Sequence, residues 1–261
     1  MQLQHHLFRF LSFSLRFLSG RVRYRNFNMN IIITGASKGF GKAIAEKFAD
    51  NGHNLYLCSR NEVDLYKTVE ELMTKYPDVS IKAKAVDLAI KEEAQSFGKW
   101  ILKLGISIDV LVNNAGQFLP GNVYNEEEGI LEKLIDINLY SAYNLTRILL
   151  PKLMEQRKAH IFNMCSIASL NAYKNGGAYS ISKFALAGFS KNLREEMKTY
   201  GVKVTTVYPG AAYTNSWVGS GVNPQRIMEA NDIADMIYSA SQLSDQACVE
   251  EILIRPQLGD L

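Results

Sequence analysis

The sequence predicts one α/β domain built on a doubly wound parallel sheet of about seven strands, with helices on both faces. Two observations predict this fold. After Met29, short apolar runs alternate with longer segments of helical periodicity, and this alternation requires a parallel sheet that is covered on both sides. The 261 residues have the length of one ordinary α/β domain, and no interdomain linker or internal repeat divides them.

The expected strands and helices follow one another along the chain. Apolar runs of strand length are assigned to strands, and segments whose apolar residues recur every three or four positions are assigned to helices. Pro77 and Asp78 end the second helix, since proline cannot continue one. The expected strands are 30–34, 54–58, 80–86, 108–112, 160–165, 203–208 and 248–254. The expected helices are 43–52, 62–76, 91–104, 131–156, 177–200 and 231–242.

Residues 1–28 differ from the rest and are assigned to an extension outside the domain, which spans 29–261. Arginines and serines recur on one side of a helical projection, and apolar residues face the other way. This pattern is typical of a membrane-surface helix or an organelle transit peptide. The alternative is that Met29 is the true start and the extension is misassigned. Both interpretations stay open, and under either we expect 1–28 to be poorly ordered.

The charge balance and the cysteines exclude several classes of protein. The extension holds five arginines and no acidic residue, so the other 24 basic and 26 acidic residues give the domain a net charge of −2. Nothing in such a domain suggests a nucleic-acid or membrane surface. The three cysteines are too few and too scattered for a disulfide framework or a metal cluster: Cys58, Cys165 and Cys248. We therefore expect no metal and a cytoplasmic location.

A glycine-rich turn follows the first strand, with the spacing TGxxxGxG from Thr34 to Gly41. Gly35 permits the tight turn, Gly39 lets backbone N–H groups approach a pyrophosphate, and Gly41 lets the helix lie close to the strand. The helix N-terminus adds a partial positive charge. Strand, turn and helix together predict a dinucleotide site. Three further residues of the turn are predicted to contact the cofactor: Ser37, Lys38 and Phe40.

The end of the second strand indicates which dinucleotide binds. A site for NAD presents Asp or Glu there to the adenosine ribose hydroxyls, whereas this chain has Ser59 and Arg60. Arg60 can pair with a 2′-phosphate, and Lys38 can supply a second positive charge. The sequence therefore predicts NADPH as the cofactor, with Ser59 and Arg60 among its contacts.

The segment 161–183 carries the candidate catalytic residues. Tyr179 and Lys183 lie four residues apart on one face of the expected helix, and Ser166 follows an apolar run that would end at a strand tip. A protonated lysine beside a phenol favours the phenolate, so we expect the pKa of Tyr179 to fall from about 10 toward neutrality. Tyr179 would then exchange protons near pH 7.

With these residues, the glycine-rich turn and NNAG at 113–116, the sequence over 30–261 resembles the short-chain dehydrogenase/reductases. The resemblance implies a Rossmann fold and a catalytic tetrad of Asn138, Ser166, Tyr179 and Lys183. In that tetrad Asn138 opens its helix locally to bind a water, and Lys183 also holds the nicotinamide ribose. Further cofactor contacts are implied at Asp87, Leu88, Asn114, Ala115, Gly116, Pro209, Gly210, Ala212 and Thr214. As an alternative or additional role, Asp87 caps the helix that begins near 91.

The resemblance implies a reversible reduction of a carbonyl group, in which Ser166 holds the C=O and Tyr179 donates the proton. The C-terminal segment VEEILIRPQLGDL is similar to that of bacterial sepiapterin-reductase-like members, as is Phe40. This favours a small ketone, such as a diketone or a pteridine side chain, as substrate. Two alternatives stay open: a 3-oxoacyl-carrier-protein reductase, and a non-catalytic NADPH-binding sensor or scaffold. Relatives commonly pair their long helices, which implies a homodimer or homotetramer.

Overall fold

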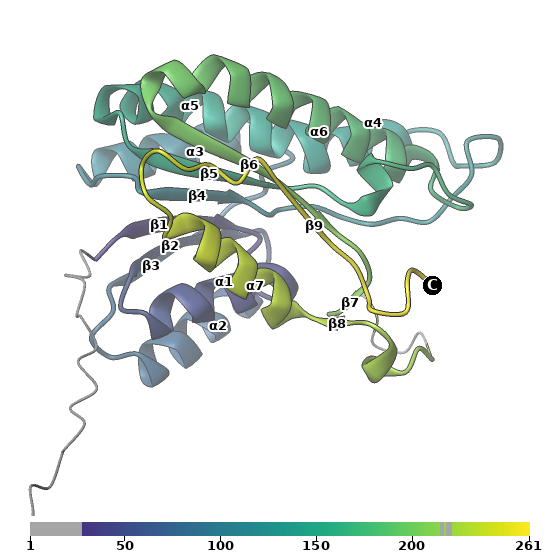
Figure 1. Ribbon diagram of the computed structural model, residues 1–261, viewed down its shortest axis with the longest axis horizontal. Coiled ribbons are helices and arrows are strands. Elements are labelled where there is room, and N and C mark those ends of the chain that lie inside the picture. The colour runs from purple at the N-terminus through teal and green to yellow at the C-terminus, as the bar shows by residue number, and fades with distance from the viewer. Residues whose placement is uncertain (1–27, 215–216, 218–220) are drawn as a thin grey trace, which may run out of the picture.

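A parallel sheet of seven strands forms the centre of the protein, in the spatial order β3-β2-β1-β4-β5-β6-β9 (Figure 1). The computed structural model describes residues 28–214, 217 and 221–261, so the predicted extension lies outside the described residues except for Asn28. The strands are β1 (Asn30–Thr34), β2 (Asn54–Ser59), β3 (Ile81–Ala85), β4 (Val110–Asn113), β5 (Ala159–Met164), β6 (Val202–Pro209) and β9 (Glu251–Ile254).

Helices cover both faces of the sheet, as Figure 1 shows. One layer contains α1 (Gly39–Asp50), α2 (Glu62–Lys75) and α7 (Ala230–Ser241). The other contains α3 (Lys91–Lys103), α5 (Ser141–Gln156) and α6 (Gly177–Met197). Because both faces are covered, the central strands are mostly apolar, and every residue of β4 and β5 is buried, including the polar Asn113, His160 and Asn163.

The chain changes direction across the sheet between β1 and β4. From β1 it winds outward through β2 to β3, and from β4 it winds the other way through β5 and β6. β1 and β4 are paired directly, with Ile31 opposite Val110 and Ile33 opposite Val112. The loops that leave these two strands therefore diverge, and their divergence opens a crevice at the carboxyl ends of the strands.

The predicted fold class is confirmed, and the boundaries of several elements are corrected. The helix expected at 131–156 consists of α4 (Ile130–Ile135), a π-helical turn (Asp136–Tyr140) and α5. The last strand begins at Glu251 instead of 248. The sequence did not predict a small parallel pair, β7 (Ala212–Tyr213) with β8 (Met228–Glu229). Short 3-10 turns occupy Ile167–Ser169, Lys198–Tyr200 and Pro224–Arg226.

No helix in the described ranges has both the length and the apolar character that crossing a membrane requires.

A histidine is built into the interior of the sheet. His160 on β5 is 4% exposed, stacks on Phe162 and shares a hydrogen bond of 2.6 Å between its Nε2 and Thr205 Oγ1. Burial lowers the pKa of His160 from 6.5 to about 3. The unfolded chain therefore takes up a proton at this position below pH 6.5, while the folded protein does not.

His160 should make the protein sensitive to acid. As the pH falls from 6.5 toward 3, its contribution should lower the free energy of unfolding by about 1.4 kcal/mol per pH unit. Urea denaturation of the protein and of His160→Gln across this range measures the effect. The free energy of unfolding of the variant should fall less steeply with decreasing pH, because its unfolding takes up one proton fewer. Parallel pH profiles for the two proteins would contradict the assignment.

Candidate active site

The turn after β1 brings the start of α1 against the end of the strand. Gly35 and Gly39 have φ angles of 64° and 56°, a backbone conformation that residues other than glycine rarely adopt. A Cβ on Gly41 would lie 2.3 Å from the Gly35 carbonyl oxygen and 2.6 Å from Asn114 Nδ2. The helix therefore lies close to the residues that directly follow β1 and β4, in line with the close approach predicted for Gly41, and this approach requires glycine.

The NNAG segment ties the neighbouring strands together. The Asn114 side chain donates from Nδ2 to the carbonyl oxygens of Thr34 (2.8 Å) and Gly35 (3.1 Å), while the backbone N–H groups of Asn114 and Ala115 donate to Thr34 Oγ1. Asn113 Nδ2 donates to Asn163 Oδ1 of β5 at 2.8 Å. As predicted, these asparagines fix the central strands relative to one another.

A cleft of about 300 Å³ runs along the carboxyl ends of the strands. It brings together residues that are widely separated in the sequence, and most of the predicted cofactor contacts line it. The predicted residues on its wall are Gly35, Ser37, Lys38, Gly39, Phe40, Ser59, Arg60, Asp87, Leu88, Asn114, Ala115, Gly116, Tyr179, Lys183, Pro209 and Thr214.

Positive charge is concentrated at one end of this cleft. Lys38 and Arg60 both line it and are exposed, and within the described part of the chain neither forms an ion pair. Between them, Ser37 Oγ and Ser59 Oγ lie 3.0 Å apart in a hydrogen bond. This end of the cleft offers two cations and hydroxyl groups to an anionic ligand.

Two observations show that the cleft fits a dinucleotide. The first turn of α1 contains no acidic residue, and its N-cap residue Lys38 makes no side-chain capping bond, so N–H groups at the helix start remain available to a phosphate. Gln117 Oε1 is buried in the cleft wall and has no hydrogen-bond donor among the described residues. A buried acceptor without a donor is costly unless a ligand satisfies it.

Tyr179 and Lys183 line the other end of the cleft, and Ser166 adjoins Tyr179 there. Lys183 is 5% exposed, and its Nζ donates to the Met164 carbonyl at 2.8 Å. This ammonium lies 5.9 Å from the centre of the Tyr179 ring. Ser166 starts a 3-10 turn, where its Oγ accepts from the Ala168 N–H at 3.1 Å. The predicted convergence of the three side chains is therefore present.

The expectation that Lys183 lowers the pKa of Tyr179 is wrong for this structure. Burial raises the pKa of Tyr179 to about 12, and a hydrogen bond with the Ser166 side chain opposes this only in part. Burial also lowers the pKa of Lys183 to about 8. Burial therefore decides both shifts, and Tyr179 holds its proton at neutral pH.

Asn138 lies in the π-helical turn between α4 and α5, so the helix is opened locally at this residue, as the resemblance implied. Its side chain bonds to protein groups. Oδ1 accepts from the Gln117 N–H at 2.8 Å, and Nδ2 donates to the Gln117 carbonyl and to Ser182 Oγ. Ser182 in turn donates to the Tyr179 carbonyl at 2.7 Å. Asn138 is thus connected to the backbone of Tyr179 through Ser182.

Some predicted residues lie off the cleft wall. Ala212 is 3% exposed and packs in the core with Met228, and Gly210 faces Pro256 and Asp260 of the C-terminal segment. Gly41 lies against Gly35 and Asn114, while Asn138 and Ser166 adjoin Gln117 and Tyr179 respectively. The alternative role for Asp87 is wrong. The N-cap of α3 is Ile90, and Asp87 Oδ1 accepts from the Ala89 N–H instead.

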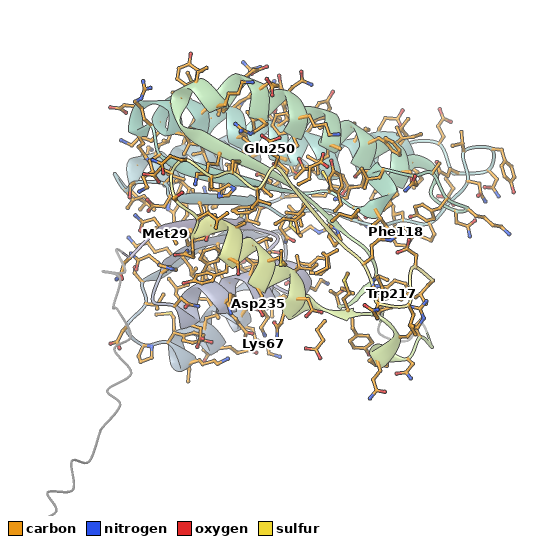
Figure 2. The ribbon with its side chains drawn as sticks, in the orientation of Figure 1. Met29, Lys67, Phe118, Trp217, Asp235 and Glu250 are labelled. Carbon is orange, nitrogen blue, oxygen red and sulfur yellow. The ribbon has the colours of Figure 1, made fainter. Side chains whose placement is uncertain are left out.

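Sequence reasoning missed part of the wall near Tyr179. The Phe118 ring meets the Tyr179 ring edge-on at 4.9 Å between centroids and is 47% exposed. Figure 2 shows Phe118 on the same side of the molecule as Trp217 and far from Met29. The only available signal was position, because Gln117 and Phe118 directly follow NNAG. The other unpredicted wall residues are Val86, Ile137, Met164 and Cys165.

Comparison with known proteins agrees with this arrangement. The sequence model of the family described as short chain dehydrogenase matches residues 29–222. An uncharacterized oxidoreductase of Staphylococcus epidermidis is 31% identical over 227 residues, which are 86% of this chain and 96% of the relative. An uncharacterized oxidoreductase of Staphylococcus aureus is 28% identical over 225 residues, with the same coverage.

Solved structures are similar over nearly the same range. A metagenomic short-chain oxidoreductase in complex with NADP is 30% identical with a TM-score of 0.77, covering 88% of this chain and 97% of its own. An alcohol dehydrogenase from the archaeon Thermococcus sibiricus, complexed with 5-hydroxy-NADP, is 25% identical with a TM-score of 0.80 and the same coverage.

Fold and cleft define a dinucleotide-binding α/β protein of the oxidoreductase class. The chain belongs to the short chain dehydrogenase family. The predicted family and enzyme class are thereby confirmed.

The close approach of Gly41 to Gly35 gives a test of the turn. Gly41→Ala places a methyl group 2.3 Å from the Gly35 oxygen and should destabilise the protein by about 1–3 kcal/mol. Gly188→Ala is the matched control, since Gly188 is helical, exposed and has no atom within 4 Å of its Cβ position. It should stabilise by about 0.5–1 kcal/mol. Urea denaturation measures both; equal effects would refute the close contact.

Proposed function

We propose that the protein is an NADPH-dependent reductase that converts a ketone of a small substrate to an alcohol, with Tyr179 as the general acid. One observation carries the proposal: the same cleft is lined by Lys38 and Arg60, which follow β1 and β2, and by Tyr179 with Lys183, whose ammonium is bonded to the end of β5. The first pair suits the phosphates of a dinucleotide, and the second suits proton transfer to a reduced carbonyl.

The choice of NADPH over NADH is supported by the charge at the cofactor end. Arg60 follows β2 at the position where an acidic residue would accept from the ribose hydroxyls of NAD. A guanidinium there binds a 2′-phosphate instead, with Lys38 as the second cation. The NADP and 5-hydroxy-NADP bound in the similar solved structures add support.

The residues at the other end provide the proton and stabilise the charge. NADPH, when bound, supplies the hydride that the substrate carbon accepts. Ser166 Oγ donates a hydrogen bond to the carbonyl oxygen, and Tyr179 Oη gives its proton to the same oxygen as negative charge develops there. The ammonium of Lys183, whose pKa is about 8, is mostly protonated at pH 7 and stabilises the resulting phenolate.

The protonation state of Tyr179 suits the reductive half of a reversible reaction, in which this residue must donate a proton. With a pKa of about 12, the phenol holds its proton at neutral pH and is ready to donate it. The buried Lys183 beside it supplies the charge that makes this donation less costly. The opposite reaction would require the phenolate at the outset.

For the substrate, we favour a small ketone with an apolar or planar body, such as a diketone or a pteridine side chain. The half-exposed Phe118 ring, held edge-on to Tyr179, offers a flat apolar surface beside the reacting group. The C-terminal similarity to sepiapterin-reductase-like proteins points the same way. A 3-oxoacyl-carrier-protein reductase is the second candidate, since its substrate is also a ketone.

A non-catalytic NADPH-binding sensor or scaffold is the candidate of another class. It is disfavoured because Asn138, Ser166, Tyr179 and Lys183 are all present and three of them converge. We further propose a cytoplasmic homodimer or homotetramer. Apolar side chains exposed on α6 and beside α5 support the pairing of these helices, among them Tyr140, Ile181 and Phe184.

Removal of the Tyr179 hydroxyl should abolish turnover and leave cofactor binding intact. Tyr179→Phe should lower kcat by about 10²–10⁴-fold, because the general acid is lost. Loss of NADPH absorbance with diketones, sepiapterin and an acetoacetyl thioester measures turnover and ranks the substrates. Tyr200→Phe, the same change at an exposed tyrosine in the 3-10 turn after α6, is the control. An active Tyr179→Phe enzyme would contradict the proposed role.

Arg60 should select the phosphorylated cofactor. Arg60→Ala should weaken NADPH binding on the order of tenfold to a hundredfold, because a charge-assisted hydrogen bond to the 2′-phosphate is lost, and leave NADH binding unchanged. Fluorescence titration with both cofactors measures this. Lys82→Ala, at an exposed residue of β3, is the control. An equal loss for both cofactors, or a wild-type preference for NADH, would refute the assignment.

A further inference from the structure

The helix that carries Tyr179 and Lys183 begins without a cap of its own. The N-cap residue of α6 is Gly176, which has no side chain to accept from the free N–H groups of the first turn. Tyr179 is the third residue of this helix, so any movement of the first turn moves the phenol. The start of α6 therefore depends on contacts from elsewhere in the chain.

Those contacts come from the loop between β4 and α4. Glu126 Oε1 accepts from the Ala178 N–H at 2.8 Å, across 52 positions of sequence. Two further bonds link the same segments: the Gly121 N–H donates to the Asn175 carbonyl, and the Asn175 N–H donates to Asn122 Oδ1, both at 3.1 Å. We refer to Gly121–Glu126 and its three bonds to 175–178 as the clasp.

The space around Glu126 is shaped for its side chain. A Cβ on Gly177 would lie 1.8 Å from Glu126 Oε1, and a Cβ on Gly121 would lie 2.6 Å from Glu126 Cγ. Both neighbours are glycine, and Asn175 has a φ of 62°, unusual for a residue other than glycine. The absence of side chains at Gly121 and Gly177 thus leaves room for the Glu126 carboxylate at the start of α6.

The same loop contacts the catalytic end at its other terminus. Gln117 is bonded to Asn138, which connects through Ser182 to the Tyr179 carbonyl, and Phe118 packs on the Tyr179 ring. Segment 117–126 therefore contacts the first turn of α6 twice, once near residue 118 and once at Glu126. In Figure 1 the loops that precede α4 and α6 extend together from one end of the molecule.

We infer that Glu126 is a positioning residue for the reduction: its carboxylate fixes the first turn of α6 and so sets the place of the Tyr179 hydroxyl relative to Ser166 and the substrate carbonyl. The inference rests on the proposed function, since it assigns Tyr179 to proton transfer. Proton transfer requires hydrogen-bond distance between donor and acceptor, so a small shift of the phenol affects the chemical step more than the binding of either ligand.

The test compares Glu126→Ala and Glu126→Gln with Glu128→Ala, which removes an exposed carboxylate from the same loop. In Glu126→Ala, kcat should fall by about tenfold to a hundredfold, because a small misplacement of a reacting group has an effect of this size. KM and NADPH affinity, measured by fluorescence, should stay near their wild-type values. Glu126→Gln keeps an acceptor oxygen for the Ala178 N–H and should restore most of kcat. Glu128→Ala should match the wild type.

Amide hydrogen exchange gives a readout that does not depend on turnover. Exchange in the peptide covering 177–184 should become faster in Glu126→Ala and stay unchanged in Glu128→Ala. Asn122→Ala removes a different hydrogen bond of the clasp and should increase the exchange rate in 177–184 by a smaller amount. This variant replaces Glu126→Ala in the test if Glu126→Ala does not fold.

The outcomes separate this inference from the proposed function. If no ketone is reduced by the wild type but exchange in 177–184 responds as described, the reaction is wrong and the clasp stands. If the wild type is active and Glu126→Ala keeps its kcat, the inference is overturned. It is also overturned if Glu126→Ala lowers kcat and NADPH affinity in parallel. A third contrary result is a Glu126→Gln variant as impaired as Glu126→Ala, since Glu126 would then not act by accepting from the Ala178 N–H.

Discussion

The hydrogen bonds between the ends of β1 and β4 are the constraint on which the rest of the site depends. Thr34 Oγ1 accepts from the backbone N–H groups of Asn114 and Ala115 at 2.9 Å each, and Asn114 Nδ2 donates back to the carbonyls of Thr34 and Gly35. These two strands lie where the chain reverses its direction across the sheet, so the segments that follow them border the cleft on its two sides. Gly41 completes the unit, because only a residue without Cβ lets α1 approach this junction. The glycine-rich turn and NNAG, far apart in sequence, thus form one structural element.

The catalytic end is held by a second set of contacts that begins in the same segment. The chain that leaves Asn114 continues to Gln117, whose backbone is bonded on both sides by the Asn138 side chain. The π-helical turn presents Asn138 there, and Ser182 passes the connection on to the Tyr179 backbone. The cofactor end and the catalytic end are therefore anchored to one another through a short stretch after β4, and the clasp at Glu126 extends the same stretch to the start of α6.

The two ends of the cleft use charge in opposite ways. Lys38 and Arg60 are exposed, so their charges are solvated and available to a ligand that brings its own negative charge. At the catalytic end, burial raises the pKa of Tyr179 and lowers that of Lys183. Both groups are thereby shifted toward their uncharged forms, which makes the phenol a proton donor at neutral pH and strengthens any charge that remains on Lys183. Cys165 beside them follows the same rule, since burial raises the pKa of its thiol to about 12 and leaves it unreactive.

Local patterns in the sequence determined the alternation of strands and helices, the glycine-rich turn and the spacing of Tyr179 and Lys183, because each depends on neighbours within a few positions. Family resemblance added the opened helix at Asn138. Other features were decided only by the tertiary structure, because they join residues that are far apart in the chain. They are the contact of Phe118 with Tyr179, the hydrogen bond between Asn138 and Ser182, and the hydrogen bond of Glu126 to the start of α6. The placement of Gly210 and Ala212 outside the cleft wall is a further example. The direction of the pKa shift at Tyr179 belongs to the same group. Spacing places the lysine near the phenol, but the pKa of Tyr179 is set mainly by its burial, which depends on residues from distant parts of the chain.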